Sequence, residues 1–174
     1  MIIRKATEKD IDAVEILYDE IHTAEEDGKQ TIGWIRGIYP IRTTAEKALE
    51  ADELFVLEDN GEIFGTGIIN KRQVEAYKAG NWEHDVPNNR VCVLHTLVIS
   101  PTVAGKGYGR AFLAFYEKYA TDNGCTELRL DTNAKNAVAR LMYKKHGYAE
   151  ICIVPTDFNG ISGIDLVLLE KYIG

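Results

Sequence analysis

The chain has 174 residues, of which 45% are hydrophobic, so we expect one domain over residues 1–174 with its own core. Its formal net charge of −7 argues against nucleic-acid binding, which depends on clustered positive charge. No signal peptide or long apolar span is found, so a cytoplasmic protein without membrane contact is expected. The three cysteines are far apart and the four histidines lack metal-ligand spacing, so neither disulfides nor a metal are expected.

Short strands and amphipathic helices alternate in the first part of the chain. Thr7 with Asp10, and Thr43 with Glu46, have the spacing of a capping box, and Asn60-Gly61 is the commonest hairpin signal. The expected elements are a strand at Ile2–Lys5, a helix with apolar residues from Ile11 to Ile21, a short helix from Thr43, and strands at Leu54–Glu58 and Ile63–Asn70.

The second part of the chain continues this alternation. Val91–Ile99 is almost entirely apolar or β-branched, as is typical of a strand buried on both faces. The expected elements after it are a helix at Tyr108–Asp122 that stops at Asn123-Gly124, a strand at Leu128–Asp131, a helix from Asn136 to Gly147, and strands near 148–155 and 162–170 around Asn159-Gly160. The unit over residues 91–131 predicts a right-handed parallel crossover within an otherwise antiparallel sheet.

A glycine-punctuated loop joins the Val91–Ile99 strand to the next helix. Gly105, Gly107 and Gly109 let the backbone approach a ligand closely, and the helix N-terminus presents unpaired N–H groups. This pattern predicts a phosphate or pyrophosphate site. It is not a Walker A loop, because Gly107 follows Lys106, and the third glycine of a dinucleotide fingerprint is absent.

A second segment, 136–148, reads NAVARLMYKKHGY. Together with the glycine loop it resembles the GCN5-related N-acetyltransferase (GNAT) family, whose two motifs are Q/R-x-x-G-x-G/A and N-x-x-A-x-x-L-Y-x-x-x-G-F/Y. The second motif matches at Asn136, Ala139, Tyr143, Gly147 and Tyr148, with Met142 in place of leucine. The loop matches at Gly107 and Gly109, but Ala104 stands where Gln or Arg is usual.

The resemblance implies a three-layer α+β fold: a mixed, mostly antiparallel seven-stranded sheet, splayed between strands 4 and 5 and flanked by about four helices. It also implies that acetyl-CoA lies in this wedge as co-substrate. The residues implied to bind it are Leu97, Val98 and Ile99 along the pantetheine arm, Gly105, Lys106, Gly107, Tyr108, Gly109 and Arg110 at the pyrophosphate, and Asn136 beside the arm.

The implied reaction is direct attack of an amine on the thioester, which calls for a general acid and a general base. Tyr143 is the predicted acid for the leaving thiolate; the alternative is a tyrosine that packs against the sheet. His95 is the predicted base or proton relay, with a core histidine as the alternative. Glu83, His84 and Asp85 form a second titratable cluster, which ranks behind His95 because most such clusters are solvated loops.

The long connection 23–42 is expected to bind the acceptor, because it carries Trp34, Arg36 and Tyr39 between two helices. Arg36 is a candidate clamp for a carboxylate, whereas the alternative is a solvated Arg36 with aromatic residues that only anchor the loop. Phe158 and Asn159 are weaker candidates for the opposite wall, and Asn159-Gly160 also suits a plain turn.

The sequence therefore predicts an acetyl-CoA-dependent N-acetyltransferase acting on the primary amine of a small molecule, without a metal. Two alternatives stay open: a protein or peptide N-acetyltransferase, and a CoA-binding regulatory domain without turnover. No nucleic-acid or membrane partner is expected, and a homodimer is left open.

Overall fold

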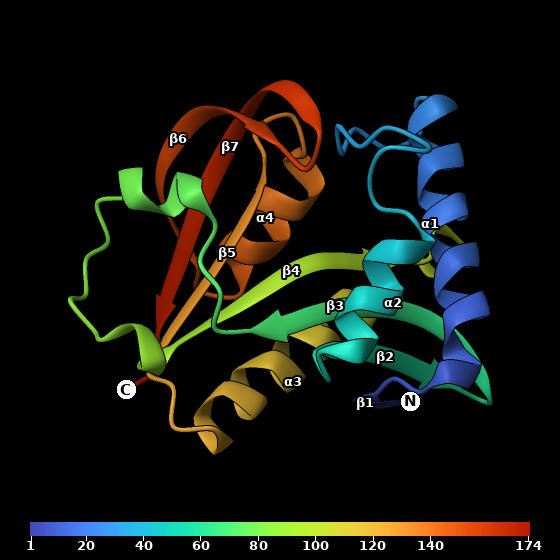
Figure 1. Cartoon of the computed structure of the whole chain (residues 1–174), viewed down its shortest axis with the longest axis horizontal. Coiled ribbons are helices and arrows are strands. Elements are labelled where there is room, and N and C mark those ends of the chain that lie inside the picture. The colour runs from blue at the N-terminus through green and yellow to red at the C-terminus, as the bar shows by residue number, and fades with distance from the viewer.

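A seven-stranded mixed sheet forms the centre of the protein, and the computed structural model describes all residues, 1–174 (Figure 1). Its strands are β1 (Ile2–Lys5), β2 (Leu54–Asp59), β3 (Glu62–Asn70), β4 (Val91–Ile99), β5 (Glu127–Asn133), β6 (Ala149–Phe158) and β7 (Ile161–Tyr172). They are ordered β1-β2-β3-β4-β5-β7-β6, and only β4 and β5 run parallel. The expected mixed, mostly antiparallel sheet is confirmed.

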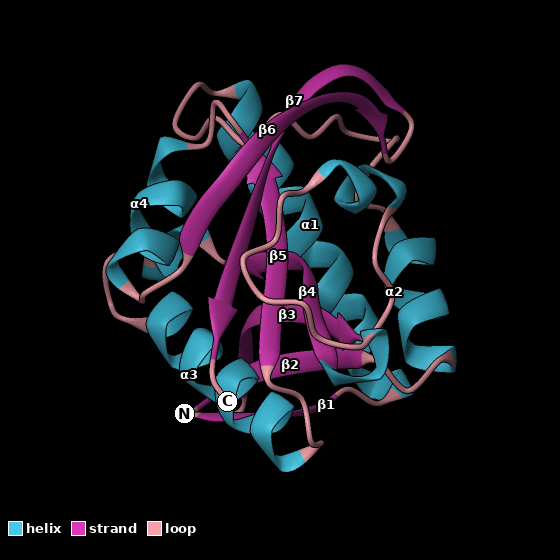
Figure 2. Ribbon diagram, turned by 90° about the vertical axis from the view of Figure 1, so that its left-hand side faces the viewer, coloured by secondary structure: helices cyan, strands magenta, loops and turns pink.

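Two helices cover each face of the sheet, as the side view shows with α3 and α4 to the left and α2 to the right (Figure 2). The helices are α1 (Ile11–Glu26), α2 (Arg42–Glu50), α3 (Tyr108–Asp122) and α4 (Ala137–Lys145). The alternation of β2 explains the layers: Leu54 and Val56 pack with α1 and α2, and Phe55 and Leu57 pack with α3. None of these helices is long and apolar enough to cross a membrane.

Two helix starts show how local side chains set the boundaries. The Asp10 carboxylate accepts a hydrogen bond from the Thr7 backbone N–H at 2.7 Å, so the predicted cap before α1 is confirmed. The predicted Thr43–Glu46 box does not form. Instead, the Thr44 hydroxyl accepts from the Ile41 N–H at 3.1 Å, and α2 begins one residue earlier than expected.

The sheet opens between β4 and β5, as predicted. The two strands pair only from Val91 to Leu94 on β4, and beyond His95 they separate. The pairing of β4 with β3 slips at the same place, where Thr96 adopts a left-handed φ of 51°. This bulge bends β4 away from β5 and creates a wedge between the strands.

The 71–90 segment, which joins β3 to β4, covers the part of the sheet that α1 and α2 do not reach. Tyr77 packs there with apolar side chains of β4 and β7, and Trp82 lies against the same cluster. The alternate residues Glu127, Arg129 and Asp131 of β5 carry the polar groups of this face. The segment thus lies beside both the wedge and the far end of β5.

Candidate active site

A cavity of about 780 Å³ occupies the wedge, which is within the usual size for a small-molecule site. It is bounded by the 105–110 loop, the second half of β4, the end of β5, α4, the connection between α1 and α2, and the β6–β7 turn. All the site residues predicted from the sequence contribute to its lining except Lys106 and Arg36. The wedge therefore brings together both sequence motifs and most of the predicted acceptor residues.

The glycine loop forms a cradle of backbone donors at the N-terminus of α3. Gly105 and Gly107 have φ values of 77° and 86°, a region that favours glycine, and a Cβ at either would point into open space. The Lys106 N–H donates to the Val103 carbonyl at 3.2 Å. No protein group accepts from the N–H groups of Gly105, Gly107, Tyr108, Gly109 and Arg110. Five such donors at a helix N-terminus suit a pyrophosphate.

The second half of β4 offers a free backbone edge toward the cavity. Val98 lies opposite Thr66 and Ile99 opposite Gly65, but on the other side β5 is no longer paired. Backbone groups left without a strand partner need hydrogen bonds from elsewhere. An amide-bearing chain such as pantetheine has the donors and acceptors to supply them, so the residues present suit acetyl-CoA.

Asn136 lines the same cavity and also shapes it. Its side-chain oxygen accepts from the Ala139 N–H at 3.1 Å and so caps α4. The side-chain NH₂ group is left to donate to a ligand. Gly109 lets α4 approach α3, since a Cβ there would lie 2.8 Å from the Met142 sulfur.

Tyr143 lies on α4 with only 6% of its surface exposed, and its hydroxyl has no protein hydrogen-bond partner. Burial raises the pKa of this hydroxyl, and the negative charge of Asp131 raises it further. The phenol therefore stays protonated at neutral pH, as a proton donor must.

His95 is held in one orientation on β4. Its Nε2 atom lies 3.0 Å from the Asn70 side-chain oxygen and 3.1 Å from the Arg72 carbonyl, so Nε2 carries the hydrogen and donates. The Asn70 amide is itself fixed, because its NH₂ group donates to Glu53 at 2.9 Å. Burial lowers the pKa of His95 to about 4, which leaves Nδ1 as the available acceptor at neutral pH.

Asp131 is a cavity residue that the sequence analysis did not single out. It directly follows the buried part of β5, and its carboxylate accepts a hydrogen bond from the Tyr77 hydroxyl at 2.8 Å. Burial raises the pKa of Asp131 to about 6. A carboxylate at the carboxyl end of a strand beside a parallel crossover was the available signal, because ligands bind at such ends.

The connection between α1 and α2 places its aromatic residues over the acceptor end. Trp34 and Tyr39 line the cavity and pack edge to face, with ring centroids 5.9 Å apart. The Tyr39 hydroxyl bonds to the Thr96 hydroxyl at the β4 bulge. Arg36 lies outside the cavity, because its guanidinium is paired with Asp19 and with Glu26, the latter at 2.9 Å.

The β6–β7 turn forms the opposite wall. Asn159 and Gly160 have φ values of 53° and 78°, as the two-residue turn requires, and Phe158 and Asn159 line the cavity. A Cβ at Gly160 would lie 3.2 Å from Ile38, so this turn reaches the connection between α1 and α2. The acceptor end is therefore bounded on both sides by contacting loops.

Comparison with known sequences identifies the family of the chain. A model of the acetyltransferase (GNAT) family matches residues 17–148. YhfO of Bacillus subtilis (strain 168), described as an uncharacterized N-acetyltransferase, is 30% identical over 97 residues. That match covers 56% of this chain and 58% of YhfO, so it spans little more than half of the relative's length.

Solved structures of low sequence identity have the same fold. The GNAT-family acetyltransferase of Streptococcus agalactiae 2603 has a TM-score of 0.81 and 24% identity, covering 98% of this chain and 94% of its own. YncA of Salmonella typhimurium, solved with its cofactor acetyl-CoA, has a TM-score of 0.70 and 18% identity, covering 99% and 94%. Since the family model matches well over half of the residues, this chain belongs to the acetyltransferase (GNAT) family.

Proposed function

We propose that the protein, as one domain over residues 1–174, transfers the acetyl group of acetyl-CoA to the primary amine of a small molecule. The cradle at 105–110 and the open edge of β4 support acetyl-CoA as the donor, because they offer unpartnered backbone groups where a pyrophosphate and a pantetheine arm would lie. The presence of acetyl-CoA in the related YncA structure agrees with this choice. In the proposal, Lys106 and Arg110 add positive charge near the phosphates.

Asp131 is the group we assign to the incoming amine. A free alkylamine has a pKa near ~10, so it arrives as an ammonium ion and must lose a proton before it attacks. A carboxylate with a pKa of about 6 is ionised at neutral pH, attracts the ammonium, and accepts its proton better than His95, whose pKa is about 4. His95, the base predicted from the sequence, is the second candidate through Nδ1.

Tyr143 is the proposed general acid. Its hydroxyl is protonated, lies in the cavity, and has no competing protein acceptor. Protonation of the departing thiolate by this hydroxyl completes the transfer, with the amine nitrogen bonded to the acetyl carbon and the carbon–sulfur bond broken.

The enclosure of the acceptor end is the observation that favours a small molecule over a protein. Trp34 and Tyr39 form one wall, Phe158 and Asn159 form the other, and the two loops touch near Ile38. A peptide chain needs an open groove. In this proposal the α1–α2 connection selects the acceptor, and Arg36 holds that connection to α1 without contacting the substrate.

The test is an acetyl-transfer assay in which the release of the CoA thiol is measured. The acceptors are a panel of small primary amines and a matched panel of peptides with free amino termini. The expected result is transfer to small amines, at a rate that Asp131→Asn strongly reduces. Exclusive acetylation of peptides would overturn the choice of acceptor. Binding of acetyl-CoA without transfer to any amine would favour a regulatory domain instead.

A further inference from the structure

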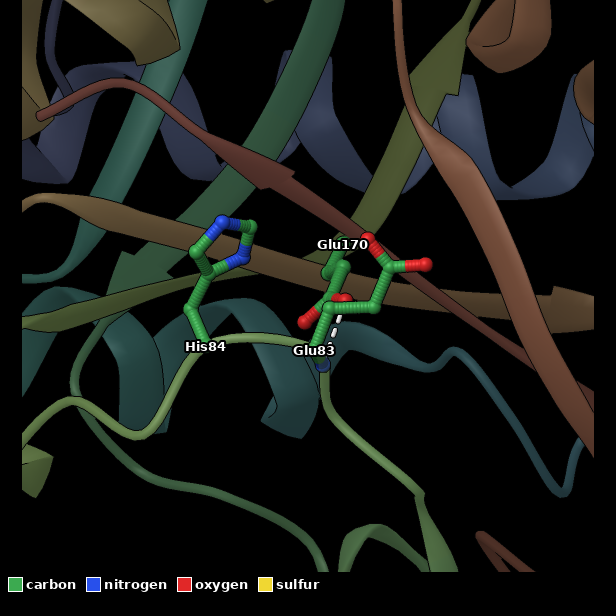
Figure 3. A group of neighbouring side chains, drawn as sticks. All are labelled: Glu83, His84 and Glu170. Carbon is green, nitrogen blue, oxygen red and sulfur yellow. Dashed lines mark hydrogen bonds between the residues drawn. The ribbon is translucent and has the colours of Figure 1, made fainter.

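A second polar cluster lies at the far end of β5, away from the cavity, where the 71–90 segment meets β7 (Figure 3). The ligand-type atoms of Glu83, His84 and Glu170 all lie within 4.8 Å of one another. The His84 ring also stacks on Tyr172, with centroids 4.2 Å apart and planes 5° apart. Figure 3 shows the Glu170 carboxylate facing the His84 ring while it accepts a hydrogen bond from the Glu83 backbone.

Two buried carboxylates at this cluster, those of Glu170 and of the neighbouring Glu127, have oxygens without a hydrogen-bond donor. Glu127 is fully buried, and neither of its oxygens has a hydrogen-bond partner in the protein. Glu170 is 2% exposed; one oxygen accepts from the Glu83 N–H at 2.8 Å, and the other has no donor. The buried Nδ1 atom of His84 is also unpartnered. Leaving such atoms without partners is costly, so the site calls for a ligand that several oxygens and one nitrogen can share.

Charge also favours a cation. Arg129 is the one cationic side chain paired with the carboxylates: its Nε atom lies 3.8 Å from Glu127, its guanidinium stacks 3.9 Å over Trp82, and it donates to Gln73 at 2.6 Å. Counted as formal charges, the three glutamates and the one guanidinium sum to two negative charges. A divalent cation balances that number.

A tetrahedral zinc site would need these side chains to move closer together. Bonds of about 2.0–2.1 Å place the ligand atoms of a tetrahedral site about 3.3 Å apart. His84 Nδ1 lies 3.8 Å from a Glu127 oxygen, and the His84, Glu83 and Glu170 atoms lie within 4.8 Å. Glu83 and His84 belong to a loop, so small side-chain shifts complete the approach.

We propose that His84, Glu127 and Glu170, with Glu83 as the fourth ligand, form a structural site for a divalent metal ion of the zinc type. The ion fastens the 71–90 segment to β5 and β7. That segment also carries Arg72 and Tyr77, which hydrogen-bond to His95 and Asp131, so the site supports the cavity from a distance.

A shared proton is the competing way to satisfy the same carboxylates. Burial and the neighbouring Glu170 raise the pKa of Glu127, which favours a neutral carboxyl in the absence of metal.

The experiment titrates Zn²⁺ into chelator-treated protein by calorimetry and follows thermal unfolding with and without Zn²⁺, with Mg²⁺ as the comparison ion. Glu127→Gln keeps the side-chain shape and removes the charge, and His84→Ala removes the nitrogen ligand. Asp85→Asn is the matched control, because Asp85 is an exposed acid in the same loop that contributes no ligand atom.

One zinc per chain, a higher melting temperature with Zn²⁺, and loss of both in Glu127→Gln and His84→Ala but not in Asp85→Asn are the expected results. The weakening should exceed the roughly 10- to 100-fold that loss of an outer-shell partner costs. Wild-type protein that does not respond to Zn²⁺, or variants that bind it as wild type does, would overturn the metal site. If the Glu127→Gln protein is at least as stable as wild type and zinc changes the stability of neither protein, then Glu127 and Glu170 share a proton and do not bind a metal ion.

Discussion

At the scale of single residues, burial moves the two candidate bases in opposite directions. It disfavours the charged form of each, so the pKa of the Asp131 carboxylic acid rises to about 6 and that of the His95 imidazole falls to about 4. Both are mainly deprotonated at neutral pH, but Asp131 is the stronger base by about two orders of magnitude. The same wedge thus makes a carboxylate, not the histidine, the better proton acceptor.

The pH dependence of kcat/KM separates these two residues. A base must be deprotonated to act, so activity through Asp131 is lost as the pH falls through about 6, whereas activity through His95 persists to about 4. We expect a wild-type acidic limb near pH 6, its loss in Asp131→Asn, and its retention in His95→Ala. The reverse pattern would return the base role to His95.

Tyr143→Phe tests the general acid. Loss of the proton donor should lower kcat by about 10²-fold and leave the KM for acetyl-CoA nearly unchanged, because the hydroxyl acts in the transition state. Steady-state kinetics with both substrates provide the measurement. Tyr148→Phe is the control, since its ring packs on Tyr143 at 5.9 Å and its buried hydroxyl does not line the cavity. Equal effects of the two substitutions would indicate a packing role.

At the scale of elements, the 105–110 loop lies between β4 and α3 and forms the proposed pyrophosphate site. The 105–110 segment follows β4 after a short turn at Pro101–Val103, includes the first residues of α3, and leaves five N–H groups without a protein acceptor. The glycines there have two different duties. Gly105 and Gly107 provide positive φ values, whereas Gly109 provides room for the Met142 side chain of α4.

Gly107→Glu should abolish the stabilisation of the protein by acetyl-CoA. A ligand at a hundredfold excess over its Kd adds about 2.7 kcal/mol, or roughly 5–10 °C in a protein of this size. The glutamate places bulk and negative charge in the cradle. Gly124→Glu is the matched control, because Gly124 has a similar φ of 72° and open space at the other end of α3. Differential scanning fluorimetry that finds the same acetyl-CoA shift in both variants would exclude this loop as the phosphate site.

At the scale of the whole molecule, an ion-pair network ties the N-terminus to the sheet. Arg4 on β1 donates to Asp10, just before α1, at 2.8 and 2.9 Å, and to Glu58 on β2 at 2.7 Å. The Asp10 side chain is only 10% exposed, and hydrogen bonds from Arg4 and Thr7 lower its pKa from 3.8 to about 2. This network contributes to global stability and lies far from the cavity.

Asp10→Asn should reduce the free energy of unfolding by about 2 kcal/mol at pH 7. A lowered carboxylate pKa stabilises the fold above the unfolded value, and this contribution is lost as the pH falls from about 4 to about 2. The variant should therefore lose less stability than wild type over that interval, as measured by urea unfolding. Asp12→Asn, whose side chain is 85% exposed, should change the stability by less than about 1 kcal/mol. Equal losses at the two positions would contradict the assignment.

Local chemistry determined much of this protein from the sequence alone. The apolar pattern of Val91–Ile99 and the start of a helix at Asn136 depend on neighbours in the chain, and both elements formed as predicted. The order of these elements sufficed for the parallel crossover, because a strand–loop–helix–strand unit has one favoured hand, and the family followed from the resemblance of the two motifs. The start of α2 lies one residue earlier than predicted, because the Thr44 hydroxyl accepts the capping hydrogen bond from the Ile41 N–H.

Only the tertiary structure decided which charges meet. Burial in the wedge raises the pKa of Asp131, which makes it a candidate base. Arg36 does not line the cavity, because it is paired with Asp19 and Glu26 of α1. Glu127 and Glu170 lie more than forty residues apart in sequence, yet adjacent strands bring both to one buried place. Hydrophobic periodicity in the sequence indicates which side of a helix or strand is buried. The pKa values and ion pairs depend on which side chains a different element places against that side, and long-range packing determines those contacts.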